Sequence, residues 1–562
     1  MSVDIKQLIA AREVERYQLH ASHLNERMVH VLKTNPLRAI PALVKAPLSK
    51  LFEILKRICF YGGTMLPSGP GTARETPALD SQFRAPSTQL KYPLHLLLHG
   101  AALAILLATF GRILHSGSAD VVSHLSLVEE IMKHGRVRPD ALNLGSMHFY
   151  TPFSHWLGAV LGWLIGSGLI AILLISIVAV YVSYYVVGRI LVAESSVLSL
   201  IAFVALYGVL AQTYSLTGWE VIGNFFYPQL VAFAMYLLAL MWLALRHPAP
   251  SHVALFVVFF SPLIYLAQPL GGVHFTATVV ATLAADALAL ILAERRFSTS
   301  YFFAAGITVA VAIAVLFLPT VRQVVSDAVN DGILDFNFPG DAYALAFAVC
   351  VAASLANLVI GLRSWPSGHV NRVLGAAGVA AGGLMALSFA LWVLGSGSPY
   401  AVKKHGFILV MLGAMNLARL VAYRFPKEVN RPWAPYAVAL LAFCATASVG
   451  RAPGEDVTTI IAAQRFAKRF TETSSIFRPG NTTAYVASLG PLVNFLISTT
   501  SFEAKLDTAF NNYGKLDGQS LYVMIDRRLA SETCLIEANN TFAVVPTQCV
   551  GPISPIVRNP WQ

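Results

Sequence analysis

The chain has 562 residues, of which 56% are hydrophobic and 12% are charged, and its formal net charge is +11. A soluble protein of this length would not bury so many apolar residues, so the composition predicts a polytopic membrane protein. Basic residues exceed acidic ones, 40 against 29, but they lie mostly in short loops between apolar runs, where they orient membrane spans. We therefore do not expect the protein to bind nucleic acid.

Residues 1–60 predict two helices, the second of which is amphipathic, with Lys45, Lys50, Lys56 and Arg57 on its polar side. Such a basic arm is expected to lie on the cytosolic membrane surface and contact anionic lipids, or else to dock onto a partner. Residues 61–92 are rich in Gly, Pro and Ser, which predicts a flexible linker. No signal-peptide pattern precedes the first apolar run, so that run is expected to act as an uncleaved anchor.

Runs of about 20 apolar residues predict eleven spans, with an uncertainty of one, and this set forms a predicted transmembrane domain over residues 93–450. The stretch Tyr150–Gly166 is too short and too interrupted to cross, and it predicts a re-entrant or interfacial helix. The eleven spans are placed near 93–114, 168–192, 196–214, 227–245, 252–271, 274–293, 300–320, 342–362, 373–395, 405–424 and 433–449.

The loops predict a cytosolic N-terminus and a periplasmic C-terminus. The Ala-rich spans and the use of Arg over Lys suggest a bacterial inner membrane, although an endoplasmic reticulum homologue would have the same orientation. Arginines collect in the loops that then lie inside, and carboxylates collect in those outside. One outside loop departs from this rule, because it contains Lys403, Lys404 and His405 in the stretch SPYAVKKHGF. We expect that exception to have a functional reason.

Residues 451–562 turn polar and contain strand-like and helix-like segments, which predicts a small extracytoplasmic α/β domain. Two cysteines of this tail, Cys534 and Cys549, can form a disulfide if the tail lies outside the cytosol, although the sequence leaves that pairing open. No pair of cysteines in the chain has the spacing of a metal site.

The first outside loop, residues 115–167, is the one long polar interval in the membrane domain. Its segment SADVVSHLSLVEEIMKHG has apolar residues near helical spacing, so it predicts a surface helix with Asp120 and His124 one turn apart on the same face. Asp120 can act as a general base toward a substrate hydroxyl, or it can simply cap this helix. Glu129 and Glu130 are more readily explained as solvated partners of Lys133 and His134.

Two opposite charges meet on the predicted outside face. Lys403 and Lys404 can neutralise the charge on a departing phosphate, with Tyr400 or His405 assisting, or they can anchor lipid headgroups. Glu220 lies between two spans beside Trp219, where a carboxylate is costly unless it is used. His124, His148 and His155 are available metal ligands, but no HxH or HExxH spacing supports a divalent metal, and no cofactor is implied.

The segment SADVVSHLSLVEEIMKHG, followed by YTPFSHWLGAVLG, resembles the DxxxHLxxAxxxxxxG…YPPLxHxL pattern of the GT-C glycosyltransferases. These polytopic enzymes take sugars from polyprenyl-phosphate carriers and include oligosaccharyltransferases, protein mannosyltransferases and aminoarabinose transferases. The resemblance covers residues 93–450 and implies that Asp120 is the base or positions the acceptor. Many members have two adjacent acids here, whereas Ala119 precedes Asp120, and whether Glu220 supplies the second carboxylate is open.

Together these features predict an inverting glycosyltransferase that moves a sugar from a polyprenyl phosphate to a glycan or protein acceptor on the extracytoplasmic face. Asp120, Glu220 and His124 are the candidate catalytic residues. Alternative readings are a lipid or glycan transporter, a glycan ligase or polymerase that uses a lipid diphosphate, and a non-catalytic scaffold. The candidate substrate-binding residues are Lys403, Lys404, His405, Tyr400, Tyr150, His148 and His155.

Overall fold

The structure, a computed structural model, describes residues 92–114, 120–193, 197–213, 227–322, 340–423, 433–447, 455–505 and 520–550. The chain divides into two units, Met1–Pro86 and Ser87–Gln562, and the first lies outside the described residues. The predicted basic arm, the linker apart from Tyr92, and Glu220 are therefore outside the part of the chain that can be discussed.

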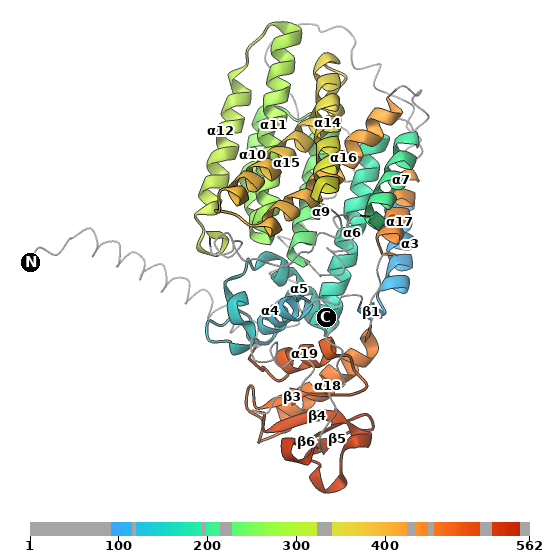
Figure 1. The fold of residues 1–562 in the computed structure, drawn as a ribbon, viewed down its shortest axis with the longest axis vertical. Helices are drawn as coiled ribbons and strands as arrows, with labels where there is room; N and C mark the ends of the chain where they lie inside the picture. The colour runs from blue at the N-terminus through green and yellow to red at the C-terminus, as the bar shows by residue number, and fades with distance from the viewer. Residues whose placement is uncertain are drawn as a thin grey trace, which may run out of the picture. The chain divides into compact units, whose positions relative to one another are not determined.

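Nine helices in the described ranges are long and apolar enough to cross a membrane, which confirms the predicted polytopic, mainly helical membrane protein (Figure 1). They are α3 (Tyr92–Phe110), α6 (Gly168–Val192), α9 (Tyr227–Arg246), α10 (Pro250–Ala267), α11 (Pro269–Glu294), α12 (Thr299–Leu316), α14 (Gly340–Arg363), α15 (His369–Val393) and α16 (Pro399–Ala422).

Two further predicted spans are shorter helices in the structure. They are α7 (Val197–Thr213), with 17 residues, and α17 (Ala434–Ala447), with 14. A straight helix needs about 20 residues to cross the hydrocarbon layer, so the count of eleven spans stays a prediction. All eleven predicted intervals nevertheless contain a helix.

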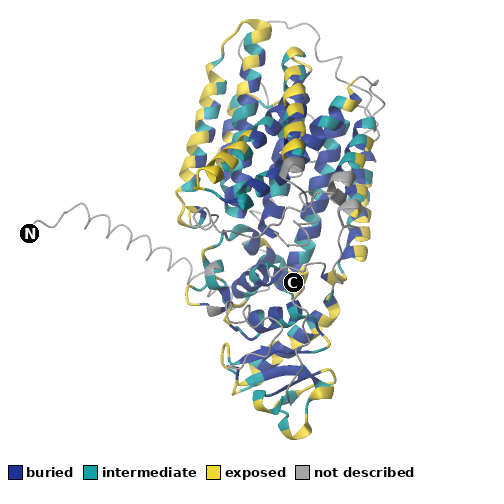
Figure 2. Ribbon diagram, in the orientation of Figure 1, coloured by how far each residue is buried: buried dark blue, intermediate teal, exposed yellow. Residues whose placement is uncertain are grey.

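Burial differs strongly among the long helices. Buried side chains line the faces that meet other helices, while α12 and α14 expose many of theirs (Figure 2). Of the residues in the most apolar stretch of α16, 78% are buried, whereas in the corresponding stretch of α12 only 22% are. Because exposed apolar side chains suit lipid and not water, α12 is a lipid-facing helix and α16 is enclosed by protein.

The helix α16 starts earlier than its predicted span at 405, because it begins at Pro399. The side chain of Ser398 accepts a hydrogen bond from the backbone N–H of Ala401, and proline favours the first helical position. The stretch predicted as a basic outside loop is therefore the first two turns of a helix. Lys403, Lys404 and His405 accordingly point in different directions around its axis.

The first loop contains three elements: α4 (Asp120–His134), the 3₁₀ segment η1 (Leu142–Phe149) and α5 (Phe153–Ile165). Helices are present where the sequence predicts a helix after Asp120 and a short helix too brief to cross, while their placement at the membrane surface stays a prediction. Val121, Leu125 and Val128 are fully buried, so α4 packs its apolar face against protein. That packing fixes the direction of the polar side chains at its start.

The C-terminal region forms a four-stranded sheet in the order β3 (Thr482–Ala484), β4 (Tyr522–Asp526), β6 (Phe542–Pro546) and β5 (Glu537–Ala538). β3 and β4 are parallel, and the other pairs are antiparallel. Met524 and Val544 pack in the same core as α18 (Val457–Thr473) and α19 (Pro491–Thr500). Alternate strand residues such as Val523 and Val545 point to the opposite face of the sheet, and Cys534 and Cys549 pack against them there.

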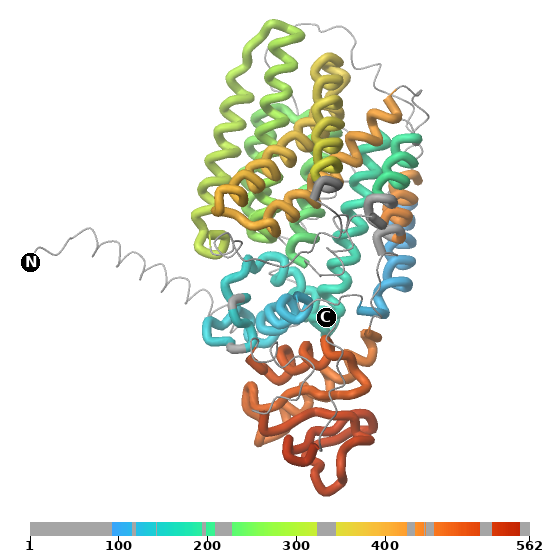
Figure 3. Tube along the Cα trace, viewed as in Figure 1, coloured from blue at the N-terminus to red at the C-terminus, as the bar shows by residue number. Residues whose placement is uncertain are grey.

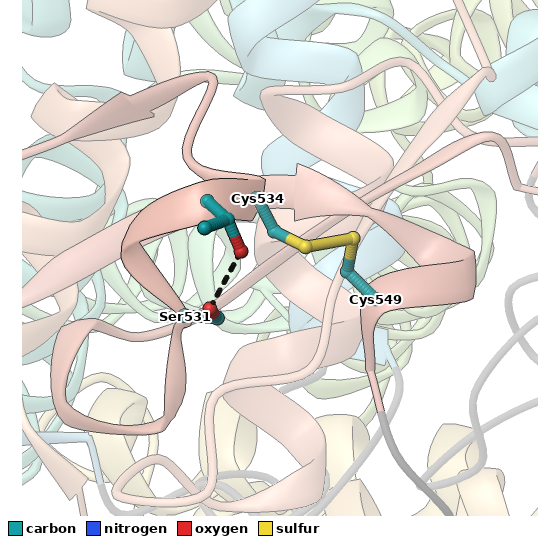
Figure 4. Close-up of a disulfide and its surroundings, with 4 residues drawn as sticks. Ser531, Cys534 and Cys549 are labelled. Carbon is teal, nitrogen blue, oxygen red and sulfur yellow. Dashed lines mark hydrogen bonds between the residues drawn. A yellow bond between two sulfur atoms is a disulfide. The ribbon is translucent and has the colours of Figure 1, made fainter.

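A disulfide joins Cys534 to Cys549, and beside it Ser531 shares a hydrogen bond of 2.9 Å with Thr533 (Figure 4). The pairing that the sequence left open is thus present. It closes a loop with a sequence separation of 15 residues. Such a bond fits an oxidising compartment.

The C-terminal region packs against the first loop (Figure 3). The side-chain amide of Asn143 in η1 donates to the carbonyl of Thr499 in α19 over 3.4 Å. Two-residue strands, β1 (Ile113–Leu114) and β2 (Glu455–Asp456), also join the end of α3 to the start of α18. The polar site described next therefore lies beside both the helices and the C-terminal region.

Candidate functional site

The centre of the candidate site is the start of α4. Asp120 is the first residue of this helix and is half-buried, and His124 follows one turn later with 6% of its surface exposed. A carboxylate at a helix N-terminus also interacts favourably with the helix dipole. The predicted shared face of Asp120 and His124 follows from this helical spacing.

Lys404 of α16 lies close enough to Asp120 for the two charges to act on each other. Its Nζ sits 4.1 Å from the centre of the Tyr400 ring, one turn earlier on the same helix. An ammonium above an aromatic face is held there by the ring quadrupole. The structure thus brings together three predicted site residues that are far apart in the sequence, Asp120, Tyr400 and Lys404.

Burial raises the pKa of Asp120 to about 6, although the positive charge of Lys404 acts in the opposite direction. Burial raises the pKa of the Tyr150 hydroxyl, and the charge of Asp120 raises it further. Tyr150 therefore lies near the Asp120 carboxyl. A carboxyl with a pKa near 6 is a good general base near neutral pH, since it is ionised there yet retains affinity for a proton.

A chain of two imidazoles leads away from this carboxyl. His124 Nδ1 lies 3.0 Å from His155 Nε2, and His155 Nδ1 lies 3.2 Å from the carbonyl of Thr151. A carbonyl only accepts, so His155 carries its proton on Nδ1 and accepts at Nε2 from the Nδ1–H of His124. In the neutral pair, His124 Nε2 is consequently left with a lone pair.

Both imidazoles are kept neutral by their surroundings. Burial lowers the pKa of His155 to about 4, and burial followed by His155 and Lys404 lowers that of His124 well below its usual range. The ring of Tyr150 packs edge-on against both, with centroid distances of 5.6 and 5.7 Å. Neutral imidazole is the form that can accept a proton.

Two residues that the sequence interpretation missed hold α5 in place. The carbonyl of Thr151 fixes the tautomer of His155, and the hydroxyl of Tyr227 in α9 donates to the carbonyl of Ser154 over 2.6 Å. Thr151 belongs to the Tyr-Thr-Pro-Phe turn that the sequence singles out, but Tyr227 begins an apolar span and shows no local signal. Only the packing of α9 on α5 reveals it.

The remaining predicted binding residues have different surroundings. Lys403 is fully buried, about 100° around the helix from Lys404. His405 Nδ1 lies 2.8 Å from Nε2 of His274 in α11, a buried residue absent from the predicted set. His148 Nδ1 bonds the carbonyl of Gly145 within η1. Among these residues, Lys404 is the one whose charge acts on Asp120.

Glu129 and Glu130 are structural, and their interpretation as solvated groups is wrong. Glu130 is 3% exposed and receives two hydrogen bonds from Arg138, at 2.6 and 3.1 Å. Its predicted partner His134 lies 3.7 Å away. Glu129 is half-buried and accepts a hydrogen bond from the backbone of Gly168, the first residue of α6. Both therefore anchor α4.

Among the described residues, no group of three or more His, Cys, Asp or Glu side chains is arranged to hold a metal ion. The chemistry that the site offers is a carboxylate base, a nearby ammonium and a neutral imidazole. This set suits the removal of a proton from a hydroxyl beside a group whose negative charge grows.

No protein-family model matches the chain, and no curated protein matches it. Among solved structures, it is similar to the crystal structure of ArnT from Cupriavidus metallidurans in the apo state. The TM-score is 0.36, the identity is 13%, and the match covers 82% of this chain and 99% of that one. The structure of the same protein bound to undecaprenyl phosphate gives a TM-score of 0.32 and 13% identity over 83% and 100%. The assignment of the site rests on the contacts described above.

Proposed function

We propose that this protein is a membrane glycosyltransferase that moves a sugar from a polyprenyl phosphate to a hydroxyl of a glycan or protein acceptor. The observation that supports it is the placement of the Asp120 carboxyl opposite the Lys404 ammonium, at the edge of a membrane-embedded bundle. A base and a phosphate-binding cation at one site are what this transfer requires.

In the proposed reaction, Asp120 takes the proton of the acceptor hydroxyl as its oxygen attacks the anomeric carbon. The bond between that carbon and the phosphate oxygen breaks with inversion, and the lipid phosphate leaves with the bonding pair. Lys404 neutralises the negative charge that develops on the phosphate. The aromatic ring of Tyr400 holds the Lys404 ammonium in place by a cation–π contact.

His124 is proposed to assist Asp120. Its Nε2 lone pair lies one helical turn from the carboxyl and can accept a hydrogen bond from the acceptor or from protonated Asp120. Glu220 remains a proposed second carboxylate, although it lies outside the described residues. We propose an extracytoplasmic active face in a bacterial inner membrane, since the predicted loop charges favour that orientation.

The first test is binding of a polyprenyl phosphate to the purified full-length protein, with Lys404→Gln compared to Arg322→Gln. Arg322 is an exposed basic residue after α12, on the same predicted side, so its replacement is a control for the lost charge. We expect Lys404→Gln to weaken binding about tenfold or more, because hydrogen bonds to charged groups contribute about 1.5–3 kcal/mol. Equal binding by both variants would remove the phosphate assignment.

The second test is transfer from a panel of radiolabelled polyprenyl-phosphate sugars into membrane acceptors. Asp120→Asn is nearly isosteric and should abolish transfer while leaving polyprenyl-phosphate binding intact. Full transfer by this variant would show that Asp120 is a structural partner of Lys404 and not a base. If no sugar is transferred by the wild type, while binding persists, a lipid-binding or transport role takes precedence.

A further inference from the structure

A second polar cluster lies at the other end of the helices, where α3, α6 and α17 meet. It consists of His95, His99, Tyr181, Tyr185, Arg189 and Tyr436, and is called here the α3–α6–α17 cluster. The proposed transfer reaction makes no use of it.

The position of this cluster along α6 places it at a membrane surface. Gly168, the first residue of α6, contacts Glu129 near the candidate site, and Arg189 lies in its last turn. These residues are separated by 21 positions, which is about 32 Å along a helix. The hydrocarbon layer is about 30 Å thick, so a first loop at one membrane surface would place Arg189 near the headgroups of the opposite leaflet.

Hydrogen bonds link five of these side chains in two groups, and ring contacts of His99 join the groups. His95 Nδ1 lies 2.6 Å from the hydroxyl of Tyr436, which is also bonded to Tyr185. His99 Nδ1 lies 2.7 Å from the hydroxyl of Tyr181. The ring of His99 stacks edge-on against Tyr185 and Tyr436, with centroids 4.6 and 4.8 Å apart.

A permanent positive charge lies beside this network. Arg189 is half-buried, and its charge acts on His95, His99 and Tyr436. Among the residues that the structure describes, no carboxylate forms an ion pair with Arg189. A cation surrounded by hydroxyl and imidazole groups is a suitable environment for an anion.

The cluster is also open toward lipid. His95 and His99 are half-buried, and their neighbours on α3 include Leu94, Leu96 and Leu97, which expose 41%, 46% and 66% of their surface. Polar donors beside exposed leucines match the two parts of a lipid, a charged headgroup and an apolar chain.

We propose that the α3–α6–α17 cluster binds the phosphate group of a membrane lipid at the surface opposite Asp120. The planar guanidinium of Arg189 would bind two phosphate oxygens, and imidazole N–H and tyrosine O–H groups would supply further donors. The exposed leucines of α3 would contact the lipid chain. The lipid phosphate can come from an anionic phospholipid or from a polyprenyl phosphate.

Native mass spectrometry of the full-length protein in detergent tests this site. Phosphatidylglycerol and a polyprenyl phosphate are the two probes, and diacylglycerol, which lacks a phosphate, is the reference lipid. We expect Arg189→Gln to weaken binding of at least one phosphate lipid about fivefold, from about 1 kcal/mol for each basic residue at a membrane surface. Binding of diacylglycerol should not change.

Arg363→Gln is the matched control, because Arg363 is an exposed arginine in the last turn of α14 and lies outside the cluster. A loss of binding confined to phosphatidylglycerol would identify a phospholipid site, and one confined to the polyprenyl phosphate would identify a carrier site. Wild-type binding of both probes by Arg189→Gln would overturn the proposal, as would an equal loss in Arg363→Gln.

Two further variants keep the test decisive. Tyr436→Phe removes the hydroxyl that joins His95 to Tyr185, and it should weaken phosphate-lipid binding even if Arg189→Gln cannot be purified in a folded form. Unchanged binding in Tyr436→Phe and in His95→Ala would then overturn the proposal. Lys404→Gln separates the two sites, because it should affect the candidate active site and leave this one unchanged.

Discussion

At the scale of single residues, the distinguishing feature is a carboxyl group whose environment suits proton transfer. Asp120 is half-buried at the start of α4, and burial raises its pKa to about 6 while Lys404 opposes that rise. The two groups determine each other's charge, so the pH dependence of activity is the most direct report on their roles.

We expect transferase activity to rise with pH through a midpoint near 6, because only ionised Asp120 accepts a proton. Lys404→Met removes the positive charge that lowers the pKa of Asp120, so the midpoint of the residual activity should move to higher pH. The profile of kcat/KM against pH measures both values. Arg322→Gln is the control, since this exposed arginine is not among the charges that act on Asp120, and a midpoint shared by the two variants would contradict the pairing.

The order of protons along the two imidazoles is a further property of single side chains. The carbonyl of Thr151 fixes His155, and His155 in turn fixes His124. Their role is therefore one of orientation as well as of charge.

At the scale of helices, close contacts between α14, α15 and α16 hold Lys404 in place. A Cβ at Gly413 of α16 would come within 2.3 Å of Cys350 Sγ, and one at Gly378 of α15 within 2.0 Å of Ser354 Oγ. The side chain of Asn416 donates to the carbonyl of Leu374 over 3.0 Å. Small residues and interhelical hydrogen bonds are the usual means of packing helices in lipid.

We expect Gly375→Ala to destabilise this packing by about 1–3 kcal/mol, the usual cost of overpacking a tight contact. A Cβ there would approach the backbone nitrogen of Leu358 to 2.5 Å, and a backbone cannot rotate away. Thermal unfolding in detergent measures the loss. Gly383→Ala lies in the same helix with nothing within 4 Å, so it should be neutral, and an equal effect of both would contradict the explanation.

A buried ion pair joins α11 to α15. The Nε of Arg372 donates to Asp286 over 2.8 Å, and its NH1 donates to the carbonyl of Gly361 in α14 over 3.0 Å. His369 Nδ1 lies 3.5 Å from the same carboxylate. Asp286 lies in the second half of the long apolar helix α11, and this pairing gives it a structural role.

Removing one partner of this pair should cost more than removing both. Asp286→Asn or Arg372→Met leaves a buried group without its counter-charge and should destabilise the protein by about 3–5 kcal/mol. The double variant Asp286→Leu/Arg372→Met should recover part of that loss. Thermal unfolding of the three variants in one detergent distinguishes the cases, and additive losses would contradict a direct pair.

At the scale of the whole unit Ser87–Gln562, the C-terminal region and the first loop are joined by charges. Glu503 pairs with Lys133 of α4, and its second oxygen lies 3.6 Å from Arg138. Arg138 also binds Glu130, so the contact continues into α4. These contacts therefore link the C-terminal region to α4, the helix that carries Asp120.

We expect Glu503→Gln to loosen this contact and so to speed hydrogen exchange in α4 and α19. The substitution removes the charge and keeps the shape of the side chain. Hydrogen–deuterium exchange followed by mass spectrometry checks it. Glu532→Gln removes a charge that pairs with Arg527 within the C-terminal region, so it should leave exchange in α4 unchanged. Identical exchange in both variants and the wild type would argue against coupling.

Elements with local signals could be predicted from the amino-acid sequence. Hydropathy located the long helices, the periodicity of residues 118–135 predicted α4, and the strand-like segments near 522 and 542 became β4 and β6. Each of these depends on neighbouring residues alone, since the lipid and the helix period act on short windows of sequence.

Which side chains meet became visible in the three-dimensional structure. It moved the start of α16 to Pro399, brought the charge of Lys404 to Asp120, and paired His124 with His155. It also brought Cys534 to Cys549 and gathered His95, Arg189 and Tyr436 from three helices. Such contacts depend on how helices rotate and pack on one another, and because partners far apart in the chain set those rotations, no local pattern encodes them.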